Sequence, residues 1–312
     1  MIFHHLPKTA GSSLGQVVRA NLRPGEFFVD NSLQFASAGL PDEESFSVRE
    51  ASLGWWRDWY ESLTGEERAR IRCVASHTAQ FLVPSVHDRP VRPFALLRDP
   101  VERVMSLYHF ALARAEADRR RGVPERLGGR QLVTGIMREN GWTVADVYRE
   151  LGRRDAPSGY RLIFSFFFNG QARELLYPYL DAAELPLTPE AGDLEDYRAR
   201  AFDVLSTYVV GTQERFSQSV RLFADSFGWR RAFIAKKNVA FHRPEIDEET
   251  RSLIRAYNSL DTELHAHYSA KLEGRPETGR LKDVHGKVSL RVRRGARKAR
   301  RTLRAGVVRR AA

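Results

Sequence analysis

The sequence predicts an α/β fold in which parallel strands alternate with helices. Short apolar segments recur at residues 2–6, 72–75, 94–97 and 208–210. Three of them end in a small-residue or charged turn, followed by apolar residues at helical spacing. The run at 94–97 is continuous rather than alternating, as expected of a strand buried on both faces of a parallel sheet. This alternation is typical of a sheet covered by helices.

The first strand and helix enclose a loop of small residues. Ile2, Phe3 and Leu6 lead through Pro7 and Lys8 into a helix expected over residues 12–22, before Pro24. The first N–H groups of a helix lack intrahelical acceptors and its dipole is positive there, so such a loop binds phosphate. Lys8 adds an ammonium group, and Ser12 and Ser13 add hydroxyl donors. The lysine precedes Gly11, which excludes the Walker A order Gly-x-x-x-x-Gly-Lys-[Ser/Thr].

A second strand-to-helix turn follows residues 94–97. Arg98 stands at the strand end, with Asp99 as the expected N-cap and Pro100 as the first helical residue. Ser106 comes seven residues, or two helical turns, after Asp99 and therefore lies on nearly the same face of the helix as Asp99. An arginine and a serine so placed can hold one phosphate. The alternative is a simple Arg98–Asp99 ion pair at a helix start.

His77 follows the short strand at 72–75, and the carboxyl ends of parallel strands are where ligands and catalytic groups gather. A single histidine in a loop is, without other evidence, a polar surface or structural residue. An aromatic cluster precedes this strand. We interpret it as packing onto the core, with stacking on sugar rings as the alternative; its members are Trp55, Trp56, Trp59 and Tyr60.

Three further segments complete the expected organisation. The charged, glycine-rich stretch 111–130 is expected to be a solvated loop, or else a contact for an anionic acceptor. Residues 162–179 are expected to form one helix packed inside the domain. A helix closed by Gly228 follows the strand at 208–210, and a last helix is expected over residues 248–272.

Taken together and in this order, these segments resemble sulfotransferase family 2, which includes bacterial carbohydrate sulfotransferases and heparan sulfate 2-O-sulfotransferases. The likeness spans most of residues 1–272. It is carried by His5–Ser13, Ser76–His77, Arg98–Tyr108, Asn169–Arg173, Val210–Ser219 and Asn258–Leu264. The resemblance implies a P-loop-like three-layer α/β fold with a mainly parallel sheet. It also implies transfer of a sulfuryl group from 3′-phosphoadenosine 5′-phosphosulfate (PAPS) to an acceptor hydroxyl on a carbohydrate or glycolipid, leaving adenosine 3′,5′-bisphosphate (PAP).

The same resemblance assigns roles to residues. Lys8 matches the lysine at the bridging oxygen and the 5′-phosphate, and Arg98 with Ser106 matches the 3′-phosphate ligands. His77 matches the catalytic base, with Ser76 where relatives commonly have glycine. The phosphosulfate cradle corresponds to Pro7, Lys8, Thr9, Ala10, Gly11, Ser12 and Ser13. A loop near the nucleotide corresponds to Lys236, Lys237 and Asn238.

These residue types suit the chemistry. Sulfuryl transfer resembles phosphoryl transfer, an in-line displacement in which negative charge builds on the leaving oxygen. A lysine and fixed N–H groups stabilise that charge, and a histidine base contributes about 10²–10⁴-fold in rate. No metal is expected. A kinase using ATP would need a Walker lysine and a Mg²⁺-holding aspartate, and neither is found. A non-catalytic protein that binds polyanions or membranes remains an alternative.

The net charge of +11 belongs to the last residues of the chain. Residues 287–312 carry eleven Lys and Arg and no acidic residue; removing these eleven from the 50 leaves 39 basic residues against 39 acidic ones. We therefore expect a sulfotransferase domain at 1–286 and a basic tail at 287–312. The tail is expected either to contact an anionic membrane surface or to be a solvated extension, without specific nucleic-acid binding.

The cellular location follows from what the sequence lacks. No run of about 18 apolar residues and no secretory signal pattern is found. The single cysteine, Cys73, fits a reducing compartment. A cytoplasmic location is expected, with peripheral attachment at the inner membrane face as a further hypothesis.

Overall fold

A computed structural model of the chain describes residues 1–29, 48–86, 88–120, 129–152, 165–179, 194–231 and 245–277. Residues 1–278 form one compact unit. The expected domain boundary at 286 and the basic tail at 287–312 lie outside the described residues.

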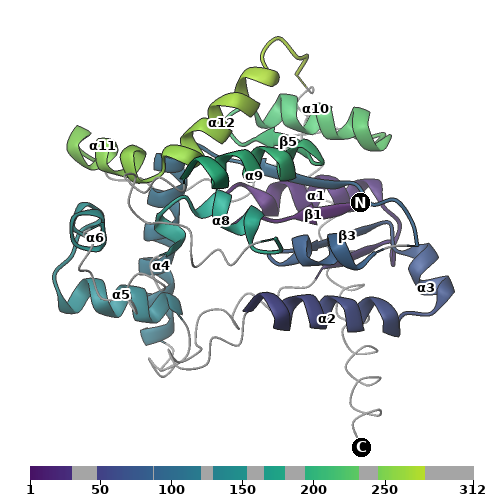
Figure 1. The fold of residues 1–312 in the computed structure, drawn as a ribbon, viewed down its shortest axis with the longest axis horizontal. Helices are drawn as coiled ribbons and strands as arrows, with labels where there is room; N and C mark the ends of the chain where they lie inside the picture. Colours follow the sequence, from purple (N-terminus) through teal and green to yellow (C-terminus); the bar gives the residue numbers. More distant parts are fainter. Residues whose placement is uncertain are drawn as a thin grey trace, which may run out of the picture. The chain divides into compact units, whose positions relative to one another are not determined.

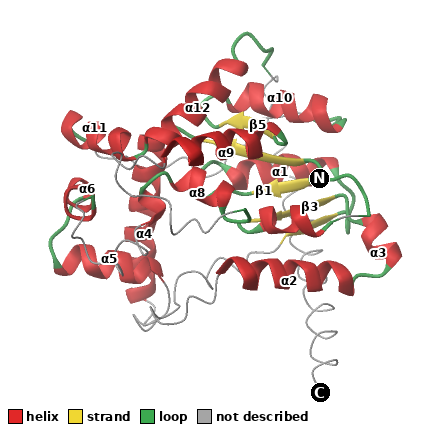
Figure 2. Ribbon diagram, viewed as in Figure 1, coloured by secondary structure: helices red, strands yellow, loops and turns green. Residues whose placement is uncertain are grey.

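The centre of this unit is a five-stranded parallel sheet (Figures 1 and 2). Its spatial order is β2-β3-β1-β4-β5, and the strands are β1 (Ile2–His4), β2 (Phe27–Val29), β3 (Cys73–Ser76), β4 (Pro93–Leu97) and β5 (Val209–Thr212). With helices packed on both faces, the predicted three-layer α/β fold with a parallel sheet is confirmed. Strand β2 was not expected from the sequence.

Strand β1 occupies the middle of the sheet. It pairs in parallel with β3 and β4, so that Phe3 lies opposite both Ala75 and Phe94. All three of its residues are buried: Ile2 and Phe3 are consecutive apolar residues, as expected in a parallel sheet, and the polar His4 is buried with them. The loop after β1 therefore lies at the centre of the carboxyl edge of the sheet, where open parallel sheets bind ligands.

Helices cover each face of the sheet. On one face, α1 (Gly11–Asn21) and α10 (Phe216–Phe227) bury Leu14, Val17 and Phe223 against Phe3 and Phe94. The opposite face is covered by α2 (Val48–Ser62) and the 3-10 helix η2 (Ala79–Ser85) near β1 and β3. Beside them, over β4 and β5, lie α8 (Gly170–Leu176), α9 (Leu194–Ser206) and α12 (Ser259–Lys271).

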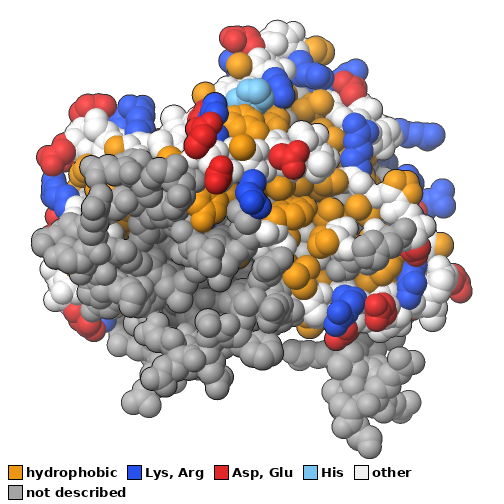
Figure 3. All heavy atoms as spheres, in the orientation of Figure 1, with side chains coloured by type: hydrophobic (Ala, Val, Ile, Leu, Met, Phe, Trp, Pro, Cys, Tyr) orange, Lys and Arg blue, Asp and Glu red, His pale blue; other side chains and the backbone are white. Residues whose placement is uncertain are grey.

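A second helical cluster extends from the end of β4. It consists of α4 (Pro100–Arg120), α5 (Gly129–Glu139), α6 (Val144–Leu151) and α11 (Glu248–Tyr257). Two short elements complete the described chain: α3 (Gly65–Arg70), which begins with a Thr64–Glu67 capping box, and the 3-10 helix η3 (Ser165–Phe167). Figure 3 shows apolar side chains across the middle of one face, over α8 and α9, with charged side chains of both signs around them.

Several predicted boundaries are confirmed. Helix α1 ends at Asn21 before Pro24, α4 begins at Pro100, and Gly228 closes α10 in the left-handed conformation with φ 66°. The expected loop at 111–130 is wrong in part, because α4 continues to Arg120 and α5 begins at Gly129. Its charged residues are compatible with a solvated helix face as well as with a loop. Residues 121–128 lie outside the described residues.

Two predicted helices are each interrupted at an asparagine. Within residues 162–179, Asn169 adopts φ 46° between η3 and α8. Within residues 248–272, Asn258 separates α11 from α12. The side chains explain the breaks: Asn258 Oδ1 accepts from Asn169 N at 2.7 Å, and Asn169 Oδ1 accepts from Asp261 N at 3.2 Å. Tertiary hydrogen bonds of the two asparagine side chains thus accompany both breaks, and at Asn169 the left-handed backbone that asparagine tolerates adds to the effect. Residues 162–164 are outside the described residues.

Within the described residues, no helix combines the length and the apolar character needed to cross a membrane.

Candidate active site

The loop between β1 and α1 has an unusual backbone. Lys8 and Ala10 both lie in the left-handed region, with φ 69° and 63°, although neither is glycine. The conformation is fixed locally, because Thr9 Oγ1 donates to Leu6 O at 2.9 Å and Ala10 O accepts from Ser13 N and Leu14 N. A left-handed residue with a Cβ costs about 1–2 kcal/mol, and such strain is characteristic of functional sites.

This backbone leaves donors at the start of α1. In the part of the chain that the structure describes, no hydrogen bond is donated by the backbone N–H groups of Thr9, Ala10, Gly11 and Ser12. Helix α1 has 11 residues, so its dipole adds partial positive charge here. The predicted phosphate loop therefore has the geometry of an anion-binding site.

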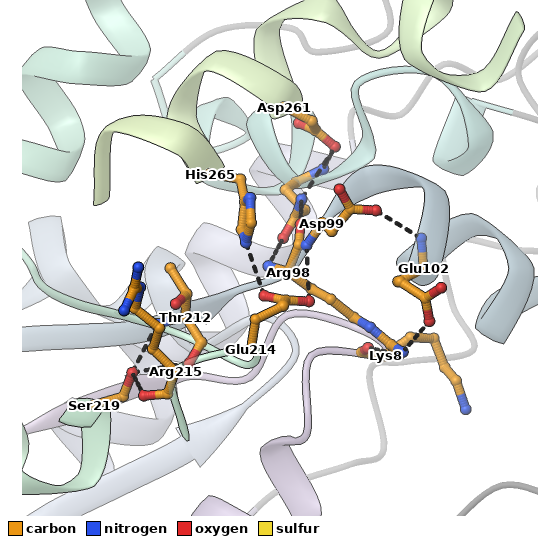
Figure 4. A network of polar contacts seen from close by, with 11 residues as sticks. Lys8, Arg98, Asp99, Glu102, Thr212, Glu214, Arg215, Ser219, Asp261 and His265 are labelled. Atoms are coloured by element: carbon orange, nitrogen blue, oxygen red, sulfur yellow. Dashed lines mark hydrogen bonds and ion pairs between the residues drawn. The ribbon is translucent and has the colours of Figure 1, made fainter. Parts of the chain in front are cut away.

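Arg98 reaches this loop from the end of β4. Its Nη1 donates to Lys8 O at 3.0 Å and its Nη2 to Glu102 Oε2 at 3.2 Å (Figure 4). The side chain is only 6% exposed. Asp99 is the helix cap that the sequence predicted, accepting from Glu102 N at 3.0 Å. The alternative Arg98–Asp99 pair is not the one that forms, because the acidic partner of the guanidinium is Glu102, one turn into α4.

One face of α4 lies toward the loop. Glu102, Ser106 and Phe110 follow one another at four-residue spacing, which places them on the same side of a helix. Arg98 contacts the first of them, and Lys8 Nζ lies 4.1 Å from the ring centroid of the last. Ser106 lies between these two contacts along the helix. The structure thus brings three predicted phosphate ligands, Lys8, Arg98 and Ser106, to one region.

His77 lies against the same loop. Its ring stacks on that of His5, with centroids 4.2 Å apart and planes 26° apart. The His5 ring in turn rests on Gly11, where an added Cβ would lie 1.8 Å from His5 Cδ2. The predicted base is therefore joined to the predicted phosphate loop through His5. Sequence reasoning gave no separate role to His5, although it stands directly before the loop.

The two histidines of β1 and the following loop are kept neutral. Burial, followed by the charge of Lys8, lowers the pKa of His5 to about 4. Burial, followed by the neighbouring His5, lowers the pKa of His4 to about 3. At neutral pH an uncharged His5 ring therefore faces His77, so His5 does not add a positive charge beside the candidate base.

The turn that carries His77 is held from two sides. Thr78 N donates to Ser76 Oγ at 3.2 Å, and Trp56 Nε1 donates to Thr78 Oγ1 at 3.1 Å. Trp56 is fully buried and Tyr60 nearly so, which confirms core packing for these two members of the aromatic cluster. Trp55 and Trp59 are half-buried, and Trp59 packs on Phe28 with ring centroids 4.5 Å apart. The side-chain oxygen of Ser76, absent from a glycine, anchors the turn here.

Three predicted ligands, a metal site and the comparisons with known proteins remain to be considered. The predicted loop near the nucleotide, with Lys236, Lys237 and Asn238, lies outside the described residues. Among the described residues, no group of three or more His, Cys, Asp or Glu side chains could hold a metal ion. No protein-family model matches the chain, and no curated protein matches it significantly.

Proposed function

We propose that this protein is a sulfotransferase that transfers a sulfuryl group from PAPS to an acceptor hydroxyl. The observation that carries the proposal is the strained loop at the centre of the sheet edge, where four backbone N–H groups and Lys8 meet Arg98. These donors suit two anionic ends of one nucleotide, the phosphosulfate at the loop and the 3′-phosphate at Arg98 and Ser106.

Each residue then has one chemical task. The acceptor oxygen forms a bond to sulfur while the bond from sulfur to the 5′-phosphate oxygen breaks. Lys8 and the N–H groups of the loop stabilise the negative charge on that leaving oxygen. His77 takes the proton of the acceptor hydroxyl, and the neutral His5 ring holds the imidazole in place.

Lys8 must move before it can act. In this structure its ammonium group lies over Phe110 and points away from the Arg98 guanidinium (Figure 4). A cation–π contact at a surface site is worth about 0.5–1 kcal/mol, so a bound phosphosulfate is a stronger partner. We expect donor binding to draw the ammonium from Phe110 onto the loop.

Binding of PAP to the full chain is the first test of the proposal. Calorimetry should show one site for PAP, weakened at least tenfold in Lys8→Met because a charge-assisted contact is lost. ATP with Mg²⁺ serves as the comparison ligand. Tighter binding of ATP than of PAP would favour a kinase, and binding of neither would reject the nucleotide site altogether.

Turnover is the second test. Labelled PAPS with a panel of glycans, glycolipids and small alcohols should give a sulfated product, with a carbohydrate or glycolipid as the proposed acceptor. His77→Ala should keep PAP affinity but lose about 10²–10⁴-fold in turnover. A folded His77→Ala variant with full turnover would show that another group takes the proton.

The basic tail is proposed to hold the protein at an anionic membrane surface, close to a lipid-linked acceptor. Removal of residues 287–312 should abolish binding to vesicles that contain anionic lipid and leave PAP binding intact. Vesicle binding equal to that of the full chain would exclude this role for the tail.

A further inference from the structure

The turn at Arg98 and Asp99 is held at three backbone atoms by two side chains from elsewhere in the chain. Gln171 Oε1 accepts from Arg98 N at 2.8 Å, and Gln171 Nε2 donates to Arg98 O at 2.8 Å. Glu214 Oε1 accepts from Asp99 N at 3.2 Å. A single amide that pairs with both the N–H and the C=O of one residue fixes the peptide groups on both sides of that residue, as a neighbouring strand would.

Both holding residues are themselves supported from α12. Asp261 accepts from Gln171 N at 3.0 Å and from Ala172 N at 2.8 Å, and Gln171 Nε2 lies 3.5 Å from the same carboxylate. His265 Nε2 lies 2.7 Å from Glu214 Oε2. Asp261 and His265 are four residues apart and so lie on one face of the helix. Figure 4 shows His265 joined to Glu214, and Glu214 joined in turn to the backbone of Asp99.

Burial of this polar network costs free energy, because its groups lose their contacts with water. Gln171 and Asp261 are at most 1% exposed, in a part of the core whose other members are mainly leucine, alanine and valine. A buried carboxylate is tolerated only when it is fully hydrogen-bonded, and an apolar packing would be at least as stable. The segments Asn169–Arg173 and Asn258–Leu264, which the phosphate motifs leave without a role, supply Gln171 and Asp261. The side chain of Gln171 bonds the backbone of Arg98, and the carboxylate of Asp261 bonds Gln171.

We propose that Gln171 and Glu214 are positioning residues that hold Arg98 in place for the 3′-phosphate of the donor, with Asp261 and His265 as their supports. The inference rests on the proposed function, because it assumes that Arg98 binds that phosphate. It adds four residues on α8, α12 and the segment after β5 to the phosphate loop and the Arg98–Ser106 motif.

The test compares two ligands that differ only in the 3′-phosphate, PAP and adenosine 5′-monophosphate. Calorimetry should show that Glu214→Ala loses roughly tenfold in PAP affinity, the value of one hydrogen bond, while its affinity for the monophosphate is unchanged. Glu214→Gln keeps an oxygen that can accept from Asp99 N, and should bind PAP like the wild type. Because Glu214 is 35% exposed, both variants should fold.

Gln171→Leu removes both bonds to Arg98 and should lose more PAP affinity than Glu214→Ala, again without loss for the monophosphate. Gln80→Leu is the matched control, since Gln80 is also buried and bonds α8 through Glu174 O at 3.2 Å without contacting Arg98. It should leave the ratio of the two affinities unchanged.

The outcomes separate the two proposals. A wild-type protein that binds PAP no better than the monophosphate would reject the proposed 3′-phosphate site and the positioning role with it. A wild-type preference for PAP that persists in Glu214→Ala would overturn the positioning role alone. Equal loss for both nucleotides in Glu214→Ala would also overturn it, because a merely structural residue would affect both.

Discussion

The rings of His5 and His77 stack 4.2 Å apart, one at the start of the candidate phosphate loop and the other at the end of the neighbouring strand. Since β1 and β3 pair in parallel, with His4 opposite Ser76, the residues that follow them emerge side by side. His5 N also donates to Ser76 O at 3.0 Å, so the backbones are joined as well as the rings. The candidate base and the candidate anion site are therefore in direct contact through both ring stacking and the backbone.

The first prediction concerns the stacked ring. His5→Phe keeps an aromatic ring on His77 and should keep most of the turnover of PAPS. His5→Ala leaves a gap beside His77, and we expect turnover to fall about tenfold, since catalysis is sensitive to small displacements of a reacting group. PAP affinity measured by calorimetry should stay within about threefold in both variants. Equal turnover in the two variants would show that the stacking has no catalytic effect.

The second prediction concerns Gly11. Gly11→Ala places a methyl group within 2.0 Å of His5 Nε2, so the ring must move, and we expect a loss of about 1–3 kcal/mol in the free energy of unfolding. His5→Ala makes room for that methyl group. In urea unfolding, the double variant should be less destabilised than the sum of the two single variants. Additive effects would mean that the contact between Gly11 and His5 carries no strain.

The third prediction concerns the left-handed Ala10. Glycine adopts positive φ without steric cost, so Ala10→Gly should raise the free energy of unfolding by up to about 1 kcal/mol and keep PAP affinity. The control is Ala199→Gly, at an exposed position in the interior of α9, which should lower stability by about 0.5–1 kcal/mol. The midpoints of urea unfolding show whether each variant is more or less stable than the wild type. Destabilisation by Ala10→Gly would contradict the left-handed conformation of the loop.

The fourth prediction follows from the buried histidine of β1. The pKa of His4 is about 3 in the folded chain against 6.5 as its ordinary value, so between these pH values only the unfolded chain takes up its proton. Stability is therefore lost as pH falls below about 6.5. His4→Leu removes this contribution, and between pH 5 and 6 the slope of unfolding free energy against pH should decrease by about 1.4 kcal/mol per pH unit. An unchanged slope would contradict the burial of a neutral His4.

The fifth prediction concerns Glu174, whose contribution to stability changes with pH in the opposite direction to that of His4. Burial raises its pKa to about 7 although Arg103 counteracts the rise, so between pH 4.5 and 7 the folded chain holds a proton that the unfolded chain releases. This contribution grows as pH falls through 7. Glu174→Gln removes it and should make the slope of stability between pH 5 and 6 steeper by a similar amount. Urea unfolding at a series of fixed pH values measures the slope for His4→Leu and for Glu174→Gln. A shallower slope in Glu174→Gln than in the wild type would contradict a carboxyl that is protonated in the folded chain.

The sequence was sufficient for features that depend on local pattern. Continuous apolar runs predicted β3 and β4, Pro24 and Gly228 predicted helix ends, and the Asp-Pro pair at residues 99–100 predicted the start of α4. The small-residue loop was likewise predicted as an anion site from its order of residues alone. These features depend on backbone sterics and on the absence of hydrogen-bond acceptors within a few residues.

What the sequence did not reveal depends on distant contacts. The helix breaks at Asn169 and Asn258 come from hydrogen bonds between segments 89 residues apart. Glu102 could have been found as the partner of Arg98, because the two are four residues apart near the start of a predicted helix. Gln171 and Glu214 carry no such signal, since their contacts with residues 98 and 99 span more than 70 residues.

The support that α12 gives to the Arg98 turn has a consequence for the order of folding during synthesis. The loop after β1 and the turn after β4 are complete once about the first hundred residues have left the ribosome, and amino-terminal parts generally fold first. Asp261 and His265 emerge some 160 residues later. A nascent chain can thus form the strands that carry the proposed nucleotide site early, but the turn that positions Arg98 is fully supported only when α12 docks.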